Sequence, residues 1–182
     1  PAMYLPHKNH KAVIDVIKLL KEKYTYNLKA VFSGGDVGYK NELIKYCKNK
    51  KIENNVIFLN FVEDEALPYL YKNASAMVFP VLIGPTFTPL WEAFKMEVPV
   101  IFSNLDGAKD VYGDAVIYVD PFNVEEIALT VKRLDSDKIL KNNLIQKGKI
   151  KIDEVIKKDE YQQIFEIIEN FRQNSKTWDM NN

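Results

Sequence analysis

Residues 75–102 read SAMVFPVLIGPTFTPLWEAFKMEVPVIF, and their pattern indicates the fold class of the whole chain. Two short apolar runs, 75–79 and 98–102, stand at the ends of this stretch. Between them lie a proline-bounded loop and a helical stretch, Leu90-Trp91-Glu92-Ala93-Phe94. Apolar runs with so few polar interruptions are typical of strands that are covered on both faces. The order strand, helix, strand therefore predicts a unit of a parallel sheet.

The same alternation continues on both sides of this stretch. Further strands are expected at 28–33, 55–59 and 115–119. Apolar residues recur at helical spacing within 13–20, 67–71 and 127–134. Asn123 followed by Glu126 has the spacing of a capping box, which marks the start of the last of these helices. The sequence therefore predicts an α/β fold with a doubly wound parallel sheet.

The C-terminal part of the chain has a different pattern. Apolar residues recur at helical spacing from Asp153 to Phe171, which predicts a long helix with a break near Lys158-Asp159. The last residues, 174–182, are polar. We therefore expect one domain over 1–173 and a polar tail over 174–182.

Composition narrows the class of protein. The chain has 182 residues, 47% hydrophobic and 27% charged, the balance of a globular domain with a sizeable core. Lys and Arg together number 25, as do Asp and Glu, so no basic excess points to nucleic acid as a partner. The one cysteine, Cys47, excludes an internal disulfide, and its helical surroundings favour a small buried hydrophobe over a nucleophile. No signal peptide and no long apolar run is present, so we expect no membrane span and a cytoplasmic protein that can work beside a membrane.

Ligands of open parallel sheets bind beyond the carboxyl ends of the strands. Gly34-Gly35 follows the first predicted strand, where it is either a tight turn or a place for backbone amides to approach a phosphate. The loop 84–89, Gly-Pro-Thr-Phe-Thr-Pro, runs directly into a helix. Amides at a helix N-terminus, with threonine hydroxyls beside them, suit an anionic or hydroxyl-rich ligand.

Two charged residues flank these candidate ligand positions. Glu92, near the start of the predicted helix, either accepts hydrogen bonds from a vicinal diol such as ribose or complements the helix dipole. Lys8 precedes the first helix and offers a point charge for a diphosphate. The neighbouring His7 and His10 lack the further His or Cys ligands of a zinc site, so no metal is expected.

Four pieces of sequence together resemble the glycosyl transferases group 1 family, and specifically the C-terminal, Rossmann-like half of its two-domain GT-B fold. The pieces are 6–10 (Pro-His-Lys-Asn-His), 32–35 (Phe-Ser-Gly-Gly), 79–101 with its loop and helix, and 113–121. They occur in the family's order and spacing from about Pro6 to Arg133. The resemblance implies a long C-terminal helix that returns toward the other half of the fold.

The resemblance also implies roles for individual residues. Lys8 and Glu92 are the expected catalytic residues, Lys8 at the donor diphosphate and Glu92 at the ribose hydroxyls. The remaining positions implied to contact the donor are Gly34 and Gly35 near the phosphates, Phe61 and Val62 beside the nucleobase, Gly84 near the sugar, and Thr86, Phe87 and Thr88 through backbone amides.

The sequence departs from the family pattern at two places. The family often carries two glutamates eight positions apart, and here the first of them is Gly84 while Glu92 is the second. We interpret this as a variant of the loop. No arginine precedes Lys8, and the first strand is shortened or missing, with Pro1-Ala2 either continuing a variant strand or being foreign to the domain.

The implied reaction transfers a sugar from a nucleoside diphosphate donor, a UDP-sugar or GDP-sugar, to an acceptor hydroxyl with retention, and needs no cofactor. The acceptor would bind to an N-terminal domain that these residues lack, so we expect an inactive fragment that binds nucleotide. Polysaccharide assembly at the inner face of the membrane, with peripheral contact through the absent domain, is the implied setting.

Three alternatives stay open at this point. The first is a related domain that only binds a nucleotide or sugar, which Gly84 favours. A receiver-like or flavodoxin-like domain shares the sheet but needs acidic residues or a phosphate-cradling loop at the strand ends. A purely structural domain leaves the loop 84–89 unexplained.

Overall fold

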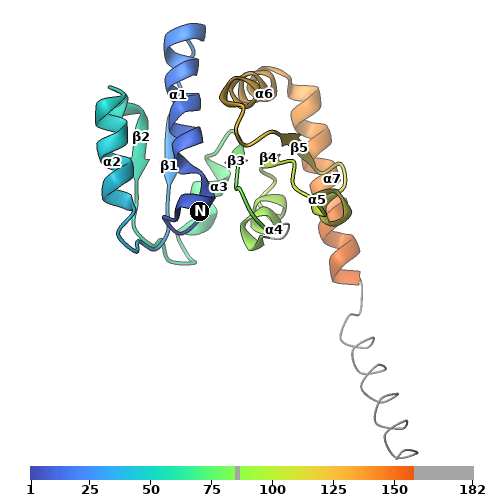
Figure 1. Ribbon diagram of the computed structural model, residues 1–182. Helices are drawn as coiled ribbons and strands as arrows, with labels where there is room; N and C mark the ends of the chain where they lie inside the picture. Colours follow the sequence, from blue (N-terminus) through green and yellow to red (C-terminus); the bar gives the residue numbers. More distant parts are fainter. Residues whose placement is uncertain (85–86, 158–182) are drawn as a thin grey trace, which may run out of the picture.

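The computed structural model describes residues 1–84 and 87–157, and its strands are all parallel to their neighbours. Strand β1 (Ala30–Phe32) pairs with β2 (Val56–Phe58) in one sheet. Strand β4 (Val100–Ser103) lies between β3 (Met77–Phe79) and β5 (Val116–Val119) in a second sheet. Each lies within a predicted strand or, for β4, extends it by one residue, so the parallel α/β fold is confirmed (Figure 1).

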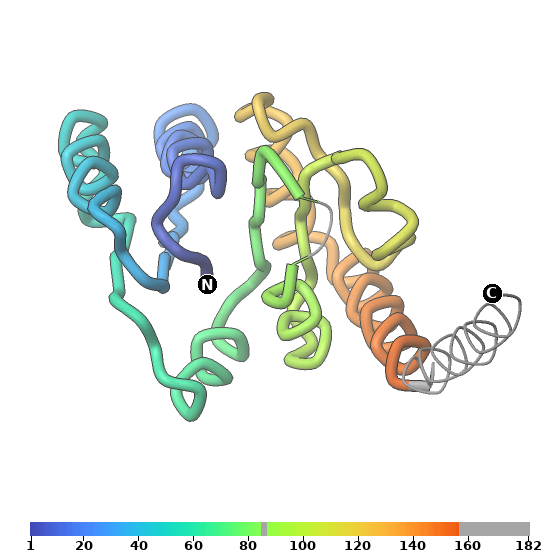
Figure 2. The backbone as a smooth tube through the Cα atoms, turned by 60° about the horizontal axis from the view of Figure 1, so that its bottom comes forward, coloured from blue at the N-terminus to red at the C-terminus, as the bar shows by residue number. Residues whose placement is uncertain are grey.

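Helices cover both faces of the strands. Figure 2 shows α1 (His10–Tyr24), α2 (Lys40–Asn49) and α6 (Val124–Ser136) on one side. Helices α3 (Leu67–Lys72), α4 (Thr88–Lys95) and α7 (Lys138–Lys157) lie on the other side, and the short α5 (Ala108–Tyr112) precedes β5. Within the described part of the chain, no helix is both long and apolar enough to cross a membrane.

Strand β4 shows how the sequence produces this layering. Its side chains alternate between the two faces, as in any strand. Ile101 packs into the apolar cluster that α1 and α6 form, whereas Val100 and Phe102 pack into the cluster around Leu90 and Phe94 of α4. Because both faces are covered by helices, every residue of the strand is buried, which explains the uninterrupted apolar run in the sequence.

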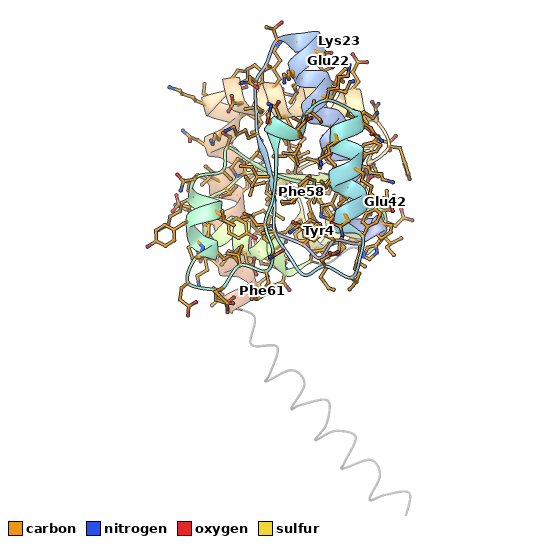
Figure 3. All side chains as sticks on the ribbon, turned by 90° about the vertical axis from the view of Figure 1, so that its left-hand side faces the viewer. Tyr4, Glu22, Lys23, Glu42, Phe58 and Phe61 are labelled. Atoms are coloured by element: carbon orange, nitrogen blue, oxygen red, sulfur yellow. The ribbon has the colours of Figure 1, made fainter. Side chains whose placement is uncertain are left out.

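The third apolar cluster lies between β1, β2, α1 and α2. Tyr4 and Phe58 lie in this region of Figure 3, with their ring centroids 6.2 Å apart. Tyr4 is fully buried, and its hydroxyl lies 3.0 Å from the Phe32 carbonyl oxygen and 2.5 Å from that of Leu59. Burial raises the pKa of Tyr4 to about 12. Cys47 is buried in the same cluster, as the helical pattern around it indicated, and burial raises the pKa of its thiol to about 11.

The sheet is divided between β1 and β3, which agrees with the first strand being shortened or missing, as the sequence indicated. The segment before α1 does not pair with β1 itself but with the residues that follow it. The Ala2 amide donates to Ser33 O at 2.7 Å, and the Tyr4 amide donates to Gly35 O at 2.9 Å. Tyr4 and Asp36 form an isolated parallel bridge. No described strand lies between β1 and β3, so the five strands form two sheets instead of one.

Two helical predictions differ from the structure. The helix expected to start at Asp153 begins at Lys138, because α7 follows α6 after a single residue, Asp137. The predicted break near Lys158-Asp159, the helix end at Phe171 and the tail 174–182 lie outside the described residues. Helix α4 begins at Thr88, two residues before the predicted Leu90, since Pro89 is well accommodated in a first helical turn.

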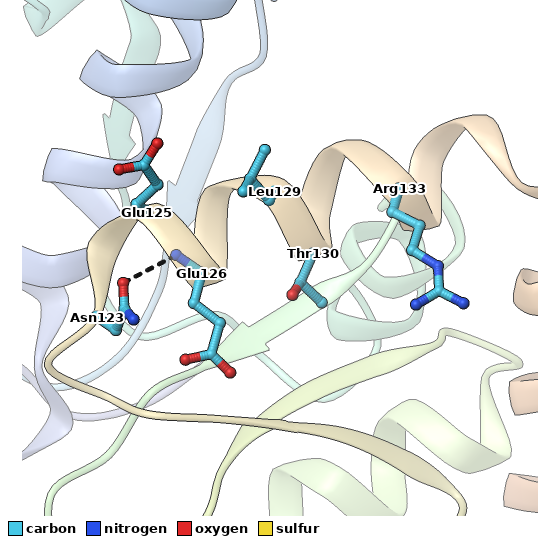
Figure 4. Close-up of a pocket in the computed structure, with 6 residues that line it drawn as sticks. All are labelled: Asn123, Glu125, Glu126, Leu129, Thr130 and Arg133. Atoms are coloured by element: carbon cyan, nitrogen blue, oxygen red, sulfur yellow. Dashed lines mark hydrogen bonds between the residues drawn. The ribbon is translucent and has the colours of Figure 1, made fainter.

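The predicted N-cap of α6 is confirmed, but the capping box is not completed, because the Asn123 amide donates to Asp120 O and not to the Glu126 carboxylate. The Asn123 side-chain oxygen accepts a hydrogen bond from the Glu126 amide at 3.0 Å, the contact drawn in Figure 4. This bond satisfies one of the amides that a helix leaves unpaired in its first turn.

Candidate functional site

The loop after β3 is held at three points. The Leu82 amide donates to His7 O at 2.9 Å, which joins the loop to the 3-10 turn Pro6–Lys8. The buried Ser103 hydroxyl donates to Val81 O at 2.6 Å. The Phe87 amide donates to the Tyr112 hydroxyl at 2.8 Å. These contacts bring the loop, the start of α4 and the Lys8 turn to the same edge of the sheet.

Lys8 lies against the aromatic residues of this edge. Its Nζ is 4.2 Å from the ring centroid of Phe87 and 5.5 Å from that of Phe79. Such cation–ring contacts hold an ammonium group in place. Burial lowers the pKa of Lys8, because water is partly excluded around its side chain. The structure thus brings together two residues that the sequence singled out, Lys8 and Phe87.

Gly84 stands in this loop for a steric reason. Its φ is 92°, in the region that favours glycine, and a Cβ built there would lie 3.0 Å from Cζ of Phe87. The position that often carries a glutamate in the resembled family is therefore occupied here by the Phe87 ring. Thr86, another predicted contact, lies outside the described residues.

The Phe87 amide, which was predicted to face a ligand, donates to the Tyr112 hydroxyl in the structure. Tyr112 is fully buried, and contact of the Phe87 amide with a ligand stays a prediction. Phe87 is the N-cap residue of α4, and Thr88 is the first helical residue. The amide of Thr88 remains at the helix N-terminus as a predicted donor to a ligand.

Glu92 is positioned by a neighbouring helix. The Tyr71 hydroxyl of α3 donates to Glu92 Oε2 at 2.7 Å and lies 3.2 Å from Pro89 O. Tyr71 is 4% exposed, and burial, followed by the Glu92 carboxylate, raises the pKa of Tyr71. The first turn of α4 contains no acidic residue, so Glu92 lies beyond the range where a helix dipole matters most. This favours the diol-binding interpretation of Glu92.

The Gly34-Gly35 turn is fixed by backbone contacts in the structure. The Gly34 amide donates to Asn60 O at 3.2 Å, and the expected place of this turn near the phosphates stays a prediction. A Cβ at Gly34 would lie 2.1 Å from the carbonyl oxygen of Ala2. Glycine is needed here because the chain before α1 passes directly over it, and the carbonyl of Gly35 accepts the Tyr4 amide.

Among the described residues, no hydrogen bond or aromatic contact joins Phe61 or Val62 to Lys8 or Glu92. Phe61 follows β2 and is 65% exposed, near the bottom of the side chains drawn in Figure 3. The preceding Asn60 is fixed by Lys40, whose Nζ lies 2.6 Å from its Oδ1. An exposed aromatic ring next to a fixed residue is compatible with a base platform, and that role stays a prediction.

Several residues of the site were missed by the sequence analysis. Tyr71, Tyr112 and Ser103 each fix a predicted residue or its loop through a hydroxyl group. Tyrosine within an apolar pattern signals burial, and only the fold reveals which group its hydroxyl meets. Asn9 carried a clearer signal, because it adopts φ 56° before α1 and its side chain donates to Pro121 O at 2.9 Å. Asparagine is among the few residues that tolerate this conformation.

A surface depression on α6 does not form a comparable site. Its lining residues are Asn123, Glu125, Glu126, Leu129, Thr130 and Arg133 (Figure 4). Asn123 is used as the helix cap, and Glu125 accepts hydrogen bonds from Lys23 at 2.5 Å and Tyr24 at 2.9 Å. Across residues 1–84 and 87–157, no three His, Cys, Asp or Glu residues gather as a metal site would require.

The fold and the edge around Lys8 define the class of protein: a Rossmann-like α/β domain with a polar site at the carboxyl ends of its strands. The family model of glycosyl transferases group 1 matches residues 2–151. The chain belongs to this family, as its motifs suggested.

Curated relatives are longer than this chain. O-antigen chain mannosyltransferase B of Escherichia coli is 30% identical over 123 residues, which are 68% of this chain and 32% of that protein. An uncharacterized glycosyltransferase of Methanocaldococcus jannaschii is 33% identical over 115 residues, 62% of this chain and 29% of that protein. The chain spans about a third of the length of these relatives.

Solved structures confirm the fold. Anabaena Alr3699/HepE in complex with UDP has a TM-score of 0.78 at 19% identity, over 93% of this chain and 48% of that one. The C-terminal domain of LpcC, a glycosyl transferase group 1 family protein of Francisella tularensis, has a TM-score of 0.70 at 22% identity, over 87% and 83% of the two chains. The chain therefore has the Rossmann-like architecture of one half of a GT-B glycosyltransferase.

Proposed function

We propose that the chain binds the nucleoside diphosphate sugar donor of a retaining glycosyltransferase. The observation that carries this proposal is the convergence of Lys8, the loop after β3 and Glu92 at one edge of the sheet. Family membership supports the donor class, because the two motifs that form this edge are those by which the chain resembles the family.

The proposed chemistry is stabilisation of a departing diphosphate. Lys8, held against Phe87, supplies a fixed positive charge, and the Thr88 amide adds a donor at the start of α4. Groups that are already oriented stabilise developing charge without reorganising during the reaction. Glu92, fixed by Tyr71 through one oxygen, presents its other carboxylate oxygen to the ribose hydroxyls. Lys8 thus supplies a positive charge at the diphosphate of the donor, and Glu92 binds its ribose.

Transfer to an acceptor would need a second domain. The curated relatives are about three times as long as the stretch that they share with this chain, which supports an additional acceptor-binding part. We propose that the 182 residues alone bind the donor and turn it over poorly. The Escherichia coli relative is a mannosyltransferase and the Anabaena structure holds UDP, so mannosyl and uridine nucleotides are the first donors to test.

A second candidate function is nucleotide-sugar binding without catalysis. Gly84, whose Cα is covered by the Phe87 ring, replaces the glutamate that often stands near the donor sugar in the family. Donor consumption by the full-length protein would separate the two functions, since a binding domain would leave the donor intact.

Calorimetric titration of UDP, GDP and ADP into the chain tests the proposal. We expect one nucleotide to bind selectively and Glu92→Ala to weaken it by about 1–3 kcal/mol, the cost of removing a hydrogen-bonded charged group. Glu97→Ala, on an exposed residue that follows the C-cap of the same helix, is the control. Equal binding of all three nucleotides, or equal affinity of both variants, would count against the proposed site.

A further inference from the structure

The hydroxyl of Tyr112, in α5, faces both backbone polar groups of Phe87. The Phe87 amide donates to this hydroxyl at 2.8 Å, and the hydroxyl lies 3.5 Å from Phe87 O. Phe87 is the N-cap residue of α4 and makes no side-chain cap. The start of α4 is therefore fixed from outside the helix, by a residue that lies 25 positions further along the chain.

Tyr112 is itself held firmly in the core. It is fully buried, and its ring centroid lies 5.3 Å from that of Trp91 in α4 and 5.4 Å from that of Phe102 in β4. Aromatic pairs at such distances stabilise a core beyond the burial of their area. The Tyr112 hydroxyl thus has a fixed place relative to both α4 and β4.

The ring of Phe87 fits closely into its surroundings. It meets the rings of Phe79 and Phe102 edge to face, at centroid distances of 5.2 Å and 5.9 Å. On another side it covers Gly84, where a Cβ would lie 3.0 Å from Cζ of the ring. The ring keeps these contacts only while the backbone of Phe87 stays where the Tyr112 hydroxyl holds it.

Lys8 depends on this ring. Its Nζ lies 4.2 Å from the centroid of Phe87 and 5.5 Å from that of Phe79. Within residues 1–84 and 87–157, no carboxylate forms an ion pair with Lys8. Burial lowers the pKa of Lys8, which agrees with a side chain packed against rings. The place of the ammonium group is therefore set mainly by Phe87.

We propose that Tyr112 is a positioning residue that holds Lys8, through Phe87, where Lys8 meets the diphosphate. Tyr112 is buried and acts without touching the ligand. A charge that is already in place stabilises a diphosphate without first having to be ordered. The link to the diphosphate rests on the proposed function, whereas the link from Tyr112 to Lys8 needs no nucleotide.

Proton NMR of the chain without nucleotide tests the link from Tyr112 to Lys8. The ring current of Phe87 should shift the ε-methylene protons of Lys8 upfield. We expect Tyr112→Phe to move this signal toward that of an exposed lysine such as Lys45. The matched control is Tyr118→Phe, which should leave the Lys8 signal unchanged.

The control removes a hydroxyl that supports the same short helix at another point. Tyr118 donates to the carbonyl oxygen of Gly113, the C-cap residue of α5, at 2.8 Å. A general loosening of α5 would therefore affect both variants, and only the loss of the bond to Phe87 is specific to Tyr112→Phe.

Calorimetry with the preferred nucleotide tests the consequence for binding. We expect Tyr112→Phe to weaken the nucleoside diphosphate about tenfold, the effect of losing one hydrogen bond, and to leave the nucleoside unchanged. In a chain that already carries Phe87→Leu, Tyr112→Phe should cause no further loss, because the ring through which it acts is gone.

An unchanged Lys8 signal in Tyr112→Phe, with the fold intact by circular dichroism, would overturn the proposal. Equal changes in Tyr112→Phe and Tyr118→Phe would overturn it too, as would a further tenfold loss in the Phe87→Leu chain. Nucleotide affinity that stays equal or rises in Tyr112→Phe would show that the hydroxyl only competes with the ligand for the Phe87 amide. If the parent binds no nucleotide, the proposed function fails, and the NMR comparison still decides whether Tyr112 positions Lys8.

Discussion

The hydroxyl of Tyr71 fixes the Glu92 carboxylate. It lies 2.7 Å from Oε2, and the tyrosine is buried, so the carboxylate has little freedom to turn. A charge-assisted hydrogen bond of this kind is stronger than one between neutral groups. We therefore regard Tyr71 as a positioning residue for the proposed ribose contact.

Tyr71→Phe keeps the ring and removes this hydrogen bond. We expect nucleotide affinity to fall about tenfold, the effect of roughly 1.4 kcal/mol, because Glu92 is no longer held toward the ribose. Calorimetry with the preferred nucleotide measures the change. Tyr69→Phe, on the same helix but 70% exposed, is the control and should bind as the parent does. A 2′,3′-dideoxy nucleotide should show no difference between Tyr71→Phe and the parent, and a loss there would argue for a merely structural role.

Lys8 is expected to act on the diphosphate and not on the nucleoside. Lys8→Met should weaken binding of a nucleoside diphosphate by about 1.5–3 kcal/mol, the range for hydrogen bonds to charged groups, and leave the weak binding of the nucleoside unchanged. Lys11→Met removes a lysine whose Nζ pairs with Glu42 on the surface and serves as the matched control. Equal losses for nucleoside and nucleoside diphosphate would contradict the assignment.

His10 makes the stability of the fold depend on pH. Burial lowers its pKa from 6.5 to about 4 in the folded chain. The unfolded chain therefore binds more protons between pH 6.5 and 4, and the free energy of unfolding falls as the pH is lowered through this window. The contribution is up to about 3 kcal/mol. Urea unfolding at several pH values should show a smaller slope in this window for His10→Asn than for the parent, and equal slopes would refute the prediction.

At the scale of elements, the loop between β3 and α4 contains a close contact between Gly84 and the Phe87 ring. Gly84 and Gly38 both have positive φ, 92° and 104°, but a Cβ at Gly38 meets nothing within 4 Å whereas one at Gly84 meets Phe87 at 3.0 Å. Alanine at either position carries backbone strain, and only at Gly84 does it also press on the ring that contacts Lys8.

We expect Gly84→Ala to be less stable than Gly38→Ala by about 1 kcal/mol, in the lower part of the range for overpacking. Chemical denaturation of the two variants gives the difference. Adding Phe87→Leu to both variants should reduce this difference in stability, because the smaller leucine side chain leaves room for the new methyl group at position 84. A Gly38→Ala variant as unstable as Gly84→Ala would show that the ring contact contributes little.

The strands were predictable because each carries an apolar run, although only β4 is buried throughout and Val31 of β1 and Ile57 of β2 are exposed. The cap of α6 was predictable because Asn123 and Glu126 act within one turn. The start of α7 was missed, since its first turns carry only scattered apolar residues, such as Ile139 and Leu144, with Ile139 76% exposed. The spacing of apolar residues therefore gives only a weak signal for the start of α7.

The site was only partly predictable from the sequence. Lys8 and Phe87 could be singled out by their place before and at helix starts, and the structure brings them together. The Phe87 amide donates to Tyr112, which is 25 residues away in the chain, and the Gly34 amide donates to Asn60 O. Long-range partners of backbone groups follow from the packed fold. The sequence indicated a shortened or missing first strand, but the gap between β1 and β3 that divides the sheet became visible only in the fold.

At the scale of the whole molecule, the chain is a Rossmann-like unit of the glycosyl transferases group 1 family with its polar edge at the carboxyl ends of β3 and its neighbours. Helices cover both faces of the strands, and loops form this edge. A second depression, on α6, offers a different location for a ligand, but there Asn123 is used as the helix cap and Glu125 is paired with Lys23 of α1.

The location of the bound nucleotide tests the central claim most directly. Two-dimensional NMR of the chain is recorded while UDP, GDP or ADP is added, with amide shifts followed at Lys8, Thr88 and Glu92 and at Thr130 and Arg133 on α6. The account predicts saturable shifts at Lys8, Thr88 and Glu92 with the preferred nucleotide, and none at the two residues of α6. Shifts that gather on α6, or no saturable shift with any of the three in the folded chain, would contradict it.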